Sequence, residues 1–396
     1  MGLMGLMGLM GLMGLMGLMG LMGCSSEDEE PVKEYGSEIE VRSCVTGYEE
    51  MERGNESRAN GTVTRAWLPP DGYSVDPTLA DKSISVFFTQ KEGEPTGGYE
   101  EEFFFMSGGK WRVSKTDLVA ESYYLYGYLP HDQSYNAKVT KLSGDGKTFA
   151  DGAVLTLENL PTVTPNDICV LIGAKNGVDD YKADPTDYSV AGLTRGSFEY
   201  AARATGEGGG GNLIYLLFDH LYSAMRFQIR VWKDYHALRT IKLKDLSMQA
   251  FTNSGAMDIP TTKKMKAEIT LNATSGSDPI SSPITFTENG DERDKGSFFD
   301  NEEGEELDTD FKTFTAHFVP QGVTKLVLTS KYDVYDKQGN LIRKGCVATN
   351  SIEISELFAE AEAKRGRRYT IQLTVRPTYL YVLSEPDLDS PTVVMN

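Results

Sequence analysis

The sequence predicts an all-β protein with enough chain for two domains of ordinary size. Short segments in which apolar and polar residues alternate recur along the chain. A turn sequence, YDKQGNL at residues 335–341, stands between two such segments and predicts a hairpin. A helical pattern is confined to ISELFAEAEAK at residues 354–364. Many short strands at this spacing are typical of sandwiches or barrels.

The alternating segments each predict a strand that buries one of its two faces. Successive side chains of a strand point to opposite faces, so every second residue packs on the same core. The apolar positions with this period are Ile84, Val86 and Phe88; Met225, Phe227, Ile229 and Val231; Met265, Ala267, Ile269 and Leu271; Phe314, Ala316 and Phe318; and Tyr369, Ile371, Leu373 and Val375.

Two stretches interrupt the strand pattern. TGEGGGG at residues 205–211 is too flexible to lie inside a strand. It is either a linker between domains or a long loop within one domain. The linker interpretation predicts an N-terminal domain at residues 36–205 and a C-terminal domain at residues 206–396. The second stretch, residues 289–310, is mostly acidic and polar, and we expect a solvated loop of the second domain there.

The N-terminus changes from apolar to acidic across one cysteine. Residues 1–23 contain only Met, Gly and Leu, and Cys24 is followed by SSEDEE. LMGC resembles a bacterial lipobox, in which the cysteine is lipidated and becomes the mature N-terminus. A membrane-spanning helix is the alternative, but it gives no reason for a cysteine at this place. We predict a lipoprotein signal at residues 1–23 and an acidic tether at residues 24–35.

The acidic run also resembles the signal that follows the lipidated cysteine in surface-exposed lipoproteins of the Bacteroidetes. A plain solvated linker is the alternative interpretation of the same residues. The charge balance of the whole chain excludes nucleic acid as a partner. The chain has 39 basic and 58 acidic residues and a formal net charge of -19, whereas phosphate binding needs a basic surface.

Patterns for catalysis are weak, and we expect neither an enzyme nor a bound metal or cofactor. SGDGKT at residues 143–148 lacks the first glycine of a phosphate-binding loop and precedes a strand, so a hairpin turn is predicted. The acids at residues 300–310 do not match an EF-hand calcium loop. His220 is interpreted as a structural histidine beside a strand. The residues without metal-ligand spacing are His131, His220, His236 and His317, and Cys44, Cys169 and Cys346.

Several segments occur in an order that resembles the fimbrillin family of the Bacteroidetes, the subunits of surface fimbriae. The segments are EIEVRSCV, TVTRAWLPP, SISVFFTQ, KWRV, YYLYGYLP, DICVLIGAK, LLFDHLYSAMRFQIRV, TIKLKDLSMQAF and GRRYTIQLTVRP. The resemblance spans most of the chain after Cys24 and rests on strand patterns. It implies two tandem transthyretin-like β-sandwich domains, export as an outer-membrane lipoprotein and a place in fimbriae at the cell surface.

The resemblance also implies proteolytic processing. In this family a protease cuts after an arginine behind the first strand, and a strand of a neighbouring subunit replaces the strand that leaves. The cut is expected between Arg65 and Ala66, or between Arg58 and Ala59, in a Gly-, Asn-, Ser- and Thr-rich stretch that proteases reach. Ordinary surface arginines are the alternative. The strand that would leave carries Ile39, Val41 and Val45.

The C-terminal tail is the candidate donor of the replacing strand. SPTVVMN at residues 390–396 follows a polar spacer that contains proline. It is equally suited to be the last strand of the second sandwich. The residues of the expected donor strand are Thr392, Val393, Val394 and Met395.

We therefore predict a structural or adhesive subunit. Its expected partners are other fimbrial subunits, the outer membrane through lipid on Cys24, and a host protein or glycan. The rival interpretation is an uncut surface lipoprotein that acts as a fimbrial anchor or binds glycans. Trp67, Trp111 and Trp232 would then stack on sugars, although aromatic residues are also ordinary in strands.

Overall fold

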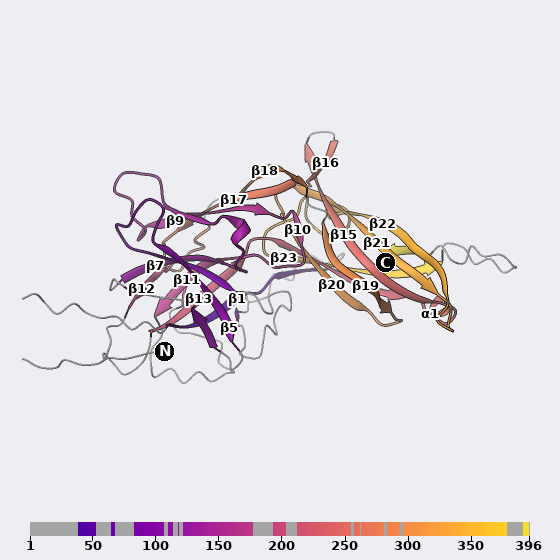
Figure 1. Cartoon of the computed structure of the whole chain (residues 1–396). Coiled ribbons are helices and arrows are strands. Elements are labelled where there is room, and N and C mark those ends of the chain that lie inside the picture. The colour runs from indigo at the N-terminus through magenta and orange to yellow at the C-terminus, as the bar shows by residue number, and fades with distance from the viewer. Residues whose placement is uncertain are drawn as a thin grey trace, which may run out of the picture. The chain divides into compact units, whose positions relative to one another are not determined.

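The structure is a computed structural model (Figure 1). It describes residues 39–52, 65–67, 83–106, 110–113, 118, 122–176, 193–202, 212–254, 257–261, 263–280, 283–293, 296–377 and 391–395. These residues belong to one compact unit, Tyr35–Asn396, and Met1–Glu34 form the other unit. The predicted signal, the tether with Cys24, the bond between Arg58 and Ala59, and residues 205–211 lie outside the described residues.

The all-β fold is confirmed for the described part of the chain. Helical structure there is limited to single turns, α1 (Lys233–His236), α2 (Ile354–Leu357) and the 3-10 turn η2 (Gln133–Tyr135). None of these described helices has the length and apolar character needed to cross a membrane. The rest of the regular structure consists of strands, as the alternating pattern predicted.

The predicted helix at residues 354–364 is wrong after its first turn. Phe358 is extended, with φ -129° and ψ 154°, and ends the helix. Glu360 is buried instead of lying on an exposed helix face. It accepts a hydrogen bond of 2.5 Å from the Tyr369 hydroxyl and pairs with the Arg367 guanidinium. These contacts with a strand outweigh the helix propensity of the short run.

The first sheet has nine strands, and its path closes on itself. The order is β11-β13-β1-β6-β5-β4-β7-β12, β3 pairs with β1, and β7 also pairs with β11. The strands are β1 (Ile39–Thr46), β3 (Arg65–Trp67), β4 (Ile84–Thr89), β5 (Tyr99–Met106), β6 (Lys110–Val113), β7 (Ser122–Leu129), β11 (Cys169–Asn176), β12 (Glu199–Ala201) and β13 (Asn212–His220).

A four-stranded sheet covers the outer face of the first sheet. Its order is β18-β17-β9-β8, and Figure 1 shows β9, β17 and β18 over the layer that contains β7, β11 and β13. One apolar cluster lies between the two sheets, and a second cluster lies on the inner face of the first sheet. The strands are β8 (Lys138–Lys141), β9 (Gly152–Leu160), β17 (Lys263–Asn272) and β18 (Thr285–Arg293).

Strand β4 departs from its predicted half-buried pattern. Ile84, Val86 and Phe88 share a buried face, as expected, but the residues between them are buried too. Phe87 packs in the cluster between the sheets, and the Ser85 hydroxyl donates to a carboxylate of β5. The strand is therefore buried on both faces, because one face lines the closed path and the other lies under the four-stranded sheet.

Two further sheets enclose a third apolar core. The six-stranded sheet has the order β10-β20-β14-β23-β2, with β24 on β23, and the five-stranded sheet has the order β16-β15-β21-β22, with β19 on β15. The strands of the six-stranded sheet are β2 (Glu49–Glu52), β10 (Val163–Thr164), β14 (Ser223–Val231), β20 (Lys312–Phe318), β23 (Arg367–Pro377) and β24 (Pro391–Met395). The strands of the five-stranded sheet are β15 (Thr240–Ser254), β16 (Met257–Thr261), β19 (Ser297–Leu307), β21 (Val323–Tyr335) and β22 (Leu341–Glu353).

The predicted faces of this core are confirmed. Every second residue of β14, β20 and β23 is buried, and the residues between them in β14 are half-buried. The same period holds in β17, which packs in the cluster between the first two sheets. The predicted turns at residues 143–148 and 335–341 connect the antiparallel pairs β8–β9 and β21–β22.

Strand pairing crosses the predicted boundary between residues 205 and 206. β13 follows this boundary, yet it pairs with β1 and β11 of the first sheet. β17 lies still later in the chain, and it pairs with β9. Both sheets of the first half thus contain strands from the second half, and the count of two tandem transthyretin-like domains stays a prediction.

The expected solvated loop at residues 289–310 is wrong, because much of it forms strands. The end of β18 and all of β19 lie in this stretch. Lysines of β15 face the acids of β19: Lys242 pairs in register with Glu306, and the Lys244 amine donates to the Glu302 carbonyl. Pairing with β15 supplies backbone partners to an edge strand that composition alone assigns to solvent.

Gly127 in β7 should not tolerate a side chain. A Cβ atom there would lie 2.1 Å from the Ser85 carbonyl oxygen of the neighbouring strand. We expect Gly127→Ala to lower the free energy of unfolding by about 2 kcal/mol or more, because the strand backbones must move apart. Urea unfolding of this variant and of Gly93→Ala tests this. An added Cβ at Gly93 has its nearest neighbour at 3.4 Å, so equal losses in the two variants would contradict the prediction.

Candidate functional site

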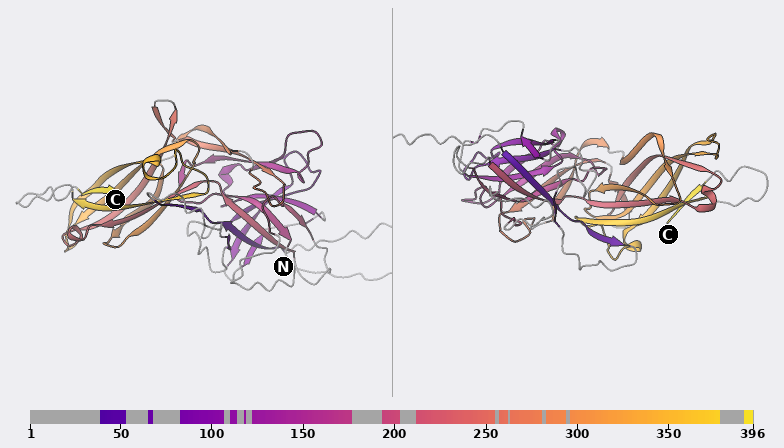
Figure 2. Two further views of the ribbon diagram at one scale, coloured as in Figure 1. Left: turned by 180° about the vertical axis from the view of Figure 1, so that it is seen from behind. Right: turned by 90° about the horizontal axis from the view of Figure 1, so that it is seen from below.

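One N-terminal segment, residues 39–52, contributes strands to two different sheets. β1 runs parallel to β13, with Val45 opposite Phe218, and antiparallel to β6 and β3 on its other side. After two further residues, β2 runs parallel to the start of β23, with Glu49 opposite Arg367. In the right view of Figure 2, the indigo segment leaves the strands of the first sheet and continues beside a yellow strand.

Strand β1 is an interior strand with a buried face. Ile39, Val41 and Val45, predicted as the first strand, are 2%, 2% and 4% exposed and pack together in the inner cluster of the first sheet. Burying one such side chain contributes about 1.5–3 kcal/mol. Loss of the segment would therefore expose an apolar groove between the unpaired edges of β13 and β6.

A buried polar cluster holds the end of β1. The Thr46 carbonyl accepts a hydrogen bond of 2.6 Å from Nε2 of His220, at the end of β13. The Thr46 hydroxyl donates to Oδ1 of Asp219. Asp219 is itself held by the Arg365 guanidinium at 2.9 Å, with Arg195 at 3.9 Å. The end of β1 is thus held by charged side chains that come from later parts of the chain.

Tyr48, between β1 and β2, completes this cluster. Its ring stacks on the His220 ring with centroids 3.5 Å apart and an interplanar angle of 16°. Its hydroxyl donates a hydrogen bond of 2.8 Å to Oδ1 of Asp167, which is fully buried before β11. The Arg368 guanidinium lies 5.3 Å from the centroid of the same ring. We refer to Thr46, Tyr48, Asp167, Asp219, His220 and Arg365 as the clamp.

His220 has an acceptor oxygen beside each ring nitrogen. Nε2 faces the Thr46 carbonyl, which only accepts, and Nδ1 lies 2.8 Å from Oδ2 of the Asp167 carboxylate. Burial acts to lower the pKa of His220, but Asp167 and Asp219 raise it above its ordinary value. Burial acts to raise the pKa of Asp167, but His220, His317 and the Tyr48 hydroxyl hold it well below its usual range. The pair is a buried imidazolium and carboxylate.

The same place contains a group of possible metal ligands. Ligand atoms of Asp167, Cys169 and His220 lie within 4.8 Å of one another. Two ligands of a tetrahedral zinc ion, each about 2.0–2.1 Å from the metal, would be about 3.3 Å apart. The 2.8 Å between His220 Nδ1 and Asp167 Oδ2 is shorter and is typical of a direct ion pair between the two side chains. The arrangement therefore supports an ion pair rather than a metal centre.

The predicted cleavage site at Arg65 and Ala66 does not lie in a loop. Both residues belong to β3, where Arg65 pairs with Thr46 and Ala66 with Val45. The stretch that proteases were expected to reach forms a short strand at this point, because the chain returns to pair with the end of β1. Whether the bond is cut stays a prediction, as it does for Arg58 and Ala59. Residues 53–64, between β2 and β3, lie outside the described residues.

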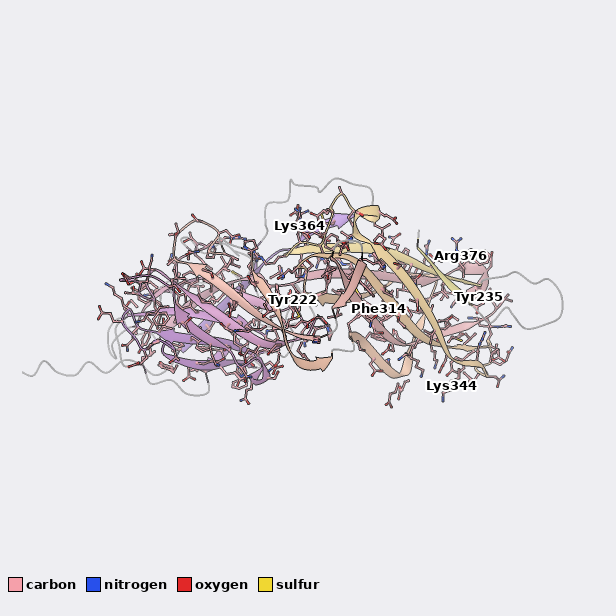
Figure 3. The ribbon with its side chains drawn as sticks, turned by 90° about the horizontal axis from the view of Figure 1, so that it is seen from above. Tyr222, Tyr235, Phe314, Lys344, Lys364 and Arg376 are labelled. Atoms are coloured by element: carbon pink, nitrogen blue, oxygen red, sulfur yellow. The ribbon has the colours of Figure 1, made fainter. Side chains whose placement is uncertain are left out.

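The predicted donor strand forms part of the six-stranded sheet. Thr392, Val393, Val394 and Met395 lie in β24, which pairs antiparallel with the end of β23. β2 pairs with the start of β23, so both short strands use β23 as their partner. Figure 3 labels Arg376, near the C-terminal end of β23, and Lys364, three residues before the strand begins. This placement agrees with a last strand of the sheet, and a role as donor stays a prediction.

The described residues also contain a concavity that a polar ligand could enter. It has a volume of about 330 Å³, and the carboxylate of Glu100 and the imidazole of His131, 3.5 Å apart, line it. Trp232, one of the residues considered for sugar stacking, packs against the core of the second pair of sheets. The side chains of Trp67 and Trp111 lie outside the described part of the structure.

Comparisons with known proteins give similar structures only. No family model matches the chain, and no curated protein matches it. A proposed cell adhesion protein from Bacteroides ovatus is similar over 91% of this chain and 96% of its own, with 12% identity and a TM-score of 0.35. A fimbrial protein from Bacteroides vulgatus is similar over 91% and 98%, with 11% identity and a TM-score of 0.33.

The fimbrial anchor protein Mfa2 from Porphyromonas gingivalis is similar over 90% of this chain and 95% of its own, with 8% identity and a TM-score of 0.27. The similar structures are thus of the kind that the sequence resemblance names. At these identities and TM-scores the likeness carries no argument about what this chain does. That argument depends on the chain's own geometry.

Sequence reasoning identified the apolar part of the site and missed most of the clamp. Only His220 was singled out, as a structural histidine. Asp167 lies 119 residues from Tyr48, and Thr46 lies 173 residues from Asp219. No local period or spacing connects residues so far apart. The one available signal was the charged and hydroxyl-bearing residues that directly follow the apolar run of β1.

The contribution of His220 to stability should depend on pH. Its pKa is raised by folding, so its stabilisation is complete below the ordinary value of about 6.5 and is lost as pH rises through the folded value. We expect His220→Gln to cost about 3 kcal/mol near pH 6, and the cost should shrink toward pH 9. Urea unfolding of wild type, His220→Gln and the half-buried control His236→Gln measures this. A cost that grows with pH would contradict the assignment of an imidazolium.

Proposed function

We propose that this chain is a structural or adhesive fimbrial subunit, exported as a lipoprotein, cut after an arginine behind its first strand, and assembled when a strand of another subunit replaces residues 39–52. The observation that carries the proposal is the double use of this segment. It supplies an interior strand to the first sheet and a strand on β23 to the six-stranded sheet.

A cut behind β2 would leave the segment held by non-covalent contacts alone. Its loss would leave unpaired backbone groups on β13 and β23, an apolar groove in the first sheet that Ile39 and Val41 now fill, and a gap in the third core that Met51 now fills. Such a groove is an unstable surface in water, and an extended strand with alternating apolar residues would restore both the ladder and the packing. This supports replacement of the segment rather than simple removal.

The tail is suited to leave its own sheet. β24 has five residues and pairs with one strand, β23, among the described residues. The sequence before it, SEPDLD, is polar and contains proline, which is typical of an extended spacer. Few backbone hydrogen bonds would need to break for the tail to reach a neighbouring subunit.

A specific observation favours the anchor interpretation as a second candidate. The clamp places a buried ion pair at the end of β1, and its partners lie on three later parts of the chain. Loss of the first strand would leave the buried Asp219 and Asp167 carboxylates without the Thr46 and Tyr48 donors, at a cost of about 1–3 kcal/mol for each. An uncut subunit that keeps its first strand and its lipid would use the clamp as a permanent attachment.

The N-terminus of the chain on the cell surface distinguishes these two candidates. We expect a mature chain that begins at Ala66 or Ala59, because an Arg-specific cut discards the lipid and the first strand. Mass spectrometry of surface-exposed protein measures it. Arg65→Lys and Arg58→Lys are matched controls that keep the charge, and one of them should block the cut. A wild-type chain that begins at lipidated Cys24 would support the anchor instead.

Polymerisation can be tested on the purified chain. Treatment with an Arg-specific protease should yield subunits joined in series that resist separation in detergent, because each strand exchange buries a complete apolar segment. Deletion of residues 391–396 should abolish the series and leave the cleaved monomer intact. Cleavage without any joined subunits, at concentrations where the cut is complete, would remove the basis for assembly by strand exchange.

A further inference from the structure

We infer that the clamp is a recognition site for an incoming peptide strand that carries Ser or Thr followed two residues later by Tyr. The inference rests on the proposed replacement of residues 39–52 and goes further, because it states the chemistry of the strand that fits. In this structure the chain's own Thr46 and Tyr48 occupy the site.

The contacts of the clamp divide cleanly between the segment and the rest of the fold. The segment supplies a hydroxyl, a carbonyl and a phenol from Thr46 and Tyr48. The rest of the fold supplies the two carboxylates of Asp219 and Asp167 and the imidazolium of His220. Every strand has a carbonyl at this place, so selection among strands depends on the hydroxyl and the phenol.

The receiving half of the clamp is built independently of the segment. Asp219 is 7% exposed, pairs with Arg365 at 2.9 Å, and accepts the backbone N–H of His220 at 3.0 Å. The Asp167 carboxylate is fully buried and pairs with the His220 ring at 2.8 Å. These ion pairs lie outside the segment, so the acceptors stay in place for an incoming strand. A preorganised site of this kind rejects a strand that lacks the matching donors, because its buried acceptors would then have no hydrogen-bond partner.

A strand without these groups would leave buried acceptors short of donors. A valine in place of Thr46 removes the hydroxyl donor to Asp219, and a phenylalanine in place of Tyr48 removes the donor to Asp167. An unsatisfied buried acceptor costs enough to weaken binding about tenfold or more. Thr46 ends β1 and Tyr48 lies two residues later, in the connection to β2, which sets the spacing of the recognised pair.

The chain's own tail meets only half of this requirement. Thr392 is followed two residues later by Val394, and no Ser or Thr from residue 378 onward precedes a Tyr at this spacing. The tail can therefore supply the hydroxyl and not the phenol. The strand that fills the site completely is therefore not the tail of a second copy of this chain.

Peptide exchange on the cut protein tests the inference. The full chain receives one engineered protease site within residues 53–64 and is cleaved, and a fluorescent peptide of residues 37–52 is added to replace the resident segment. Anisotropy measures uptake. Peptides with Thr46→Val and with Tyr48→Phe should each bind about tenfold more weakly. The control is Ser43→Ala, within about twofold of wild type, because the buried Ser43 hydroxyl has no hydrogen-bond partner among the described residues.

A coupled variant separates recognition from general loss of packing. In protein with Asp167→Asn, the Tyr48→Phe change in the peptide should lose most of its effect, because the phenol no longer meets a carboxylate. If Asp167→Asn does not fold, Asp219→Asn with the Thr46→Val peptide gives the equivalent cycle. An unchanged effect of the peptide substitution in the folded variant would overturn the inference.

A gain of binding completes the test. A peptide of residues 383–396 should bind about tenfold more weakly than the peptide of residues 37–52, and Val394→Tyr should recover most of the difference. Uptake that is indifferent to Tyr48 and to Val394→Tyr would overturn the recognition alone. A cut protein that takes up none of the peptides would overturn the proposed replacement, and the inference with it.

Discussion

The parallel pairing of residues 39–52 with β13 and β23 is the constraint on which the rest of the structure depends. Long stretches of chain separate β1 from β13 and β2 from β23, as a parallel pairing requires. The segment fills an interior position of the first sheet and continues as a strand of the six-stranded sheet. Packing of the inner cluster on β1 therefore depends on residues that follow more than a hundred positions later.

The clamp adds polar specificity to this apolar arrangement. Apolar side chains in β1 favour burial of the strand but tolerate many sequences of similar size. Buried carboxylates tolerate far fewer, because each one needs donors at fixed positions. Thr46 and Tyr48 supply these donors where the segment passes from one sheet to the other. The register of the segment is thus set by polar contacts at Thr46 and Tyr48, and by apolar packing along β1.

The apolar half of the candidate site was predictable from sequence, and the polar half was not. Ile39, Val41 and Val45 follow the period of a strand, and this period is a local property of the chain. Asp167, Asp219 and Arg365 carry no such pattern, since ordinary surface positions have the same composition. Their burial and pairing follow from the meeting of β1, β13 and the turn before β23, which only the folded chain produces.

Sequence alone determined that the chain is built from strands and which faces of β14, β17, β20 and β23 point inward. The reason is that alternation of apolar and polar side chains is a property of neighbouring residues. Tertiary structure decided what lies around each strand. Both faces of β4 are buried, and the acidic stretch of β19 pairs with β15 as an edge strand. The predicted helix ends after Leu357. Tertiary structure also placed β13 and β17 in sheets of the first half. These outcomes depend on contacts between residues far apart in the chain, for which local patterns hold no information.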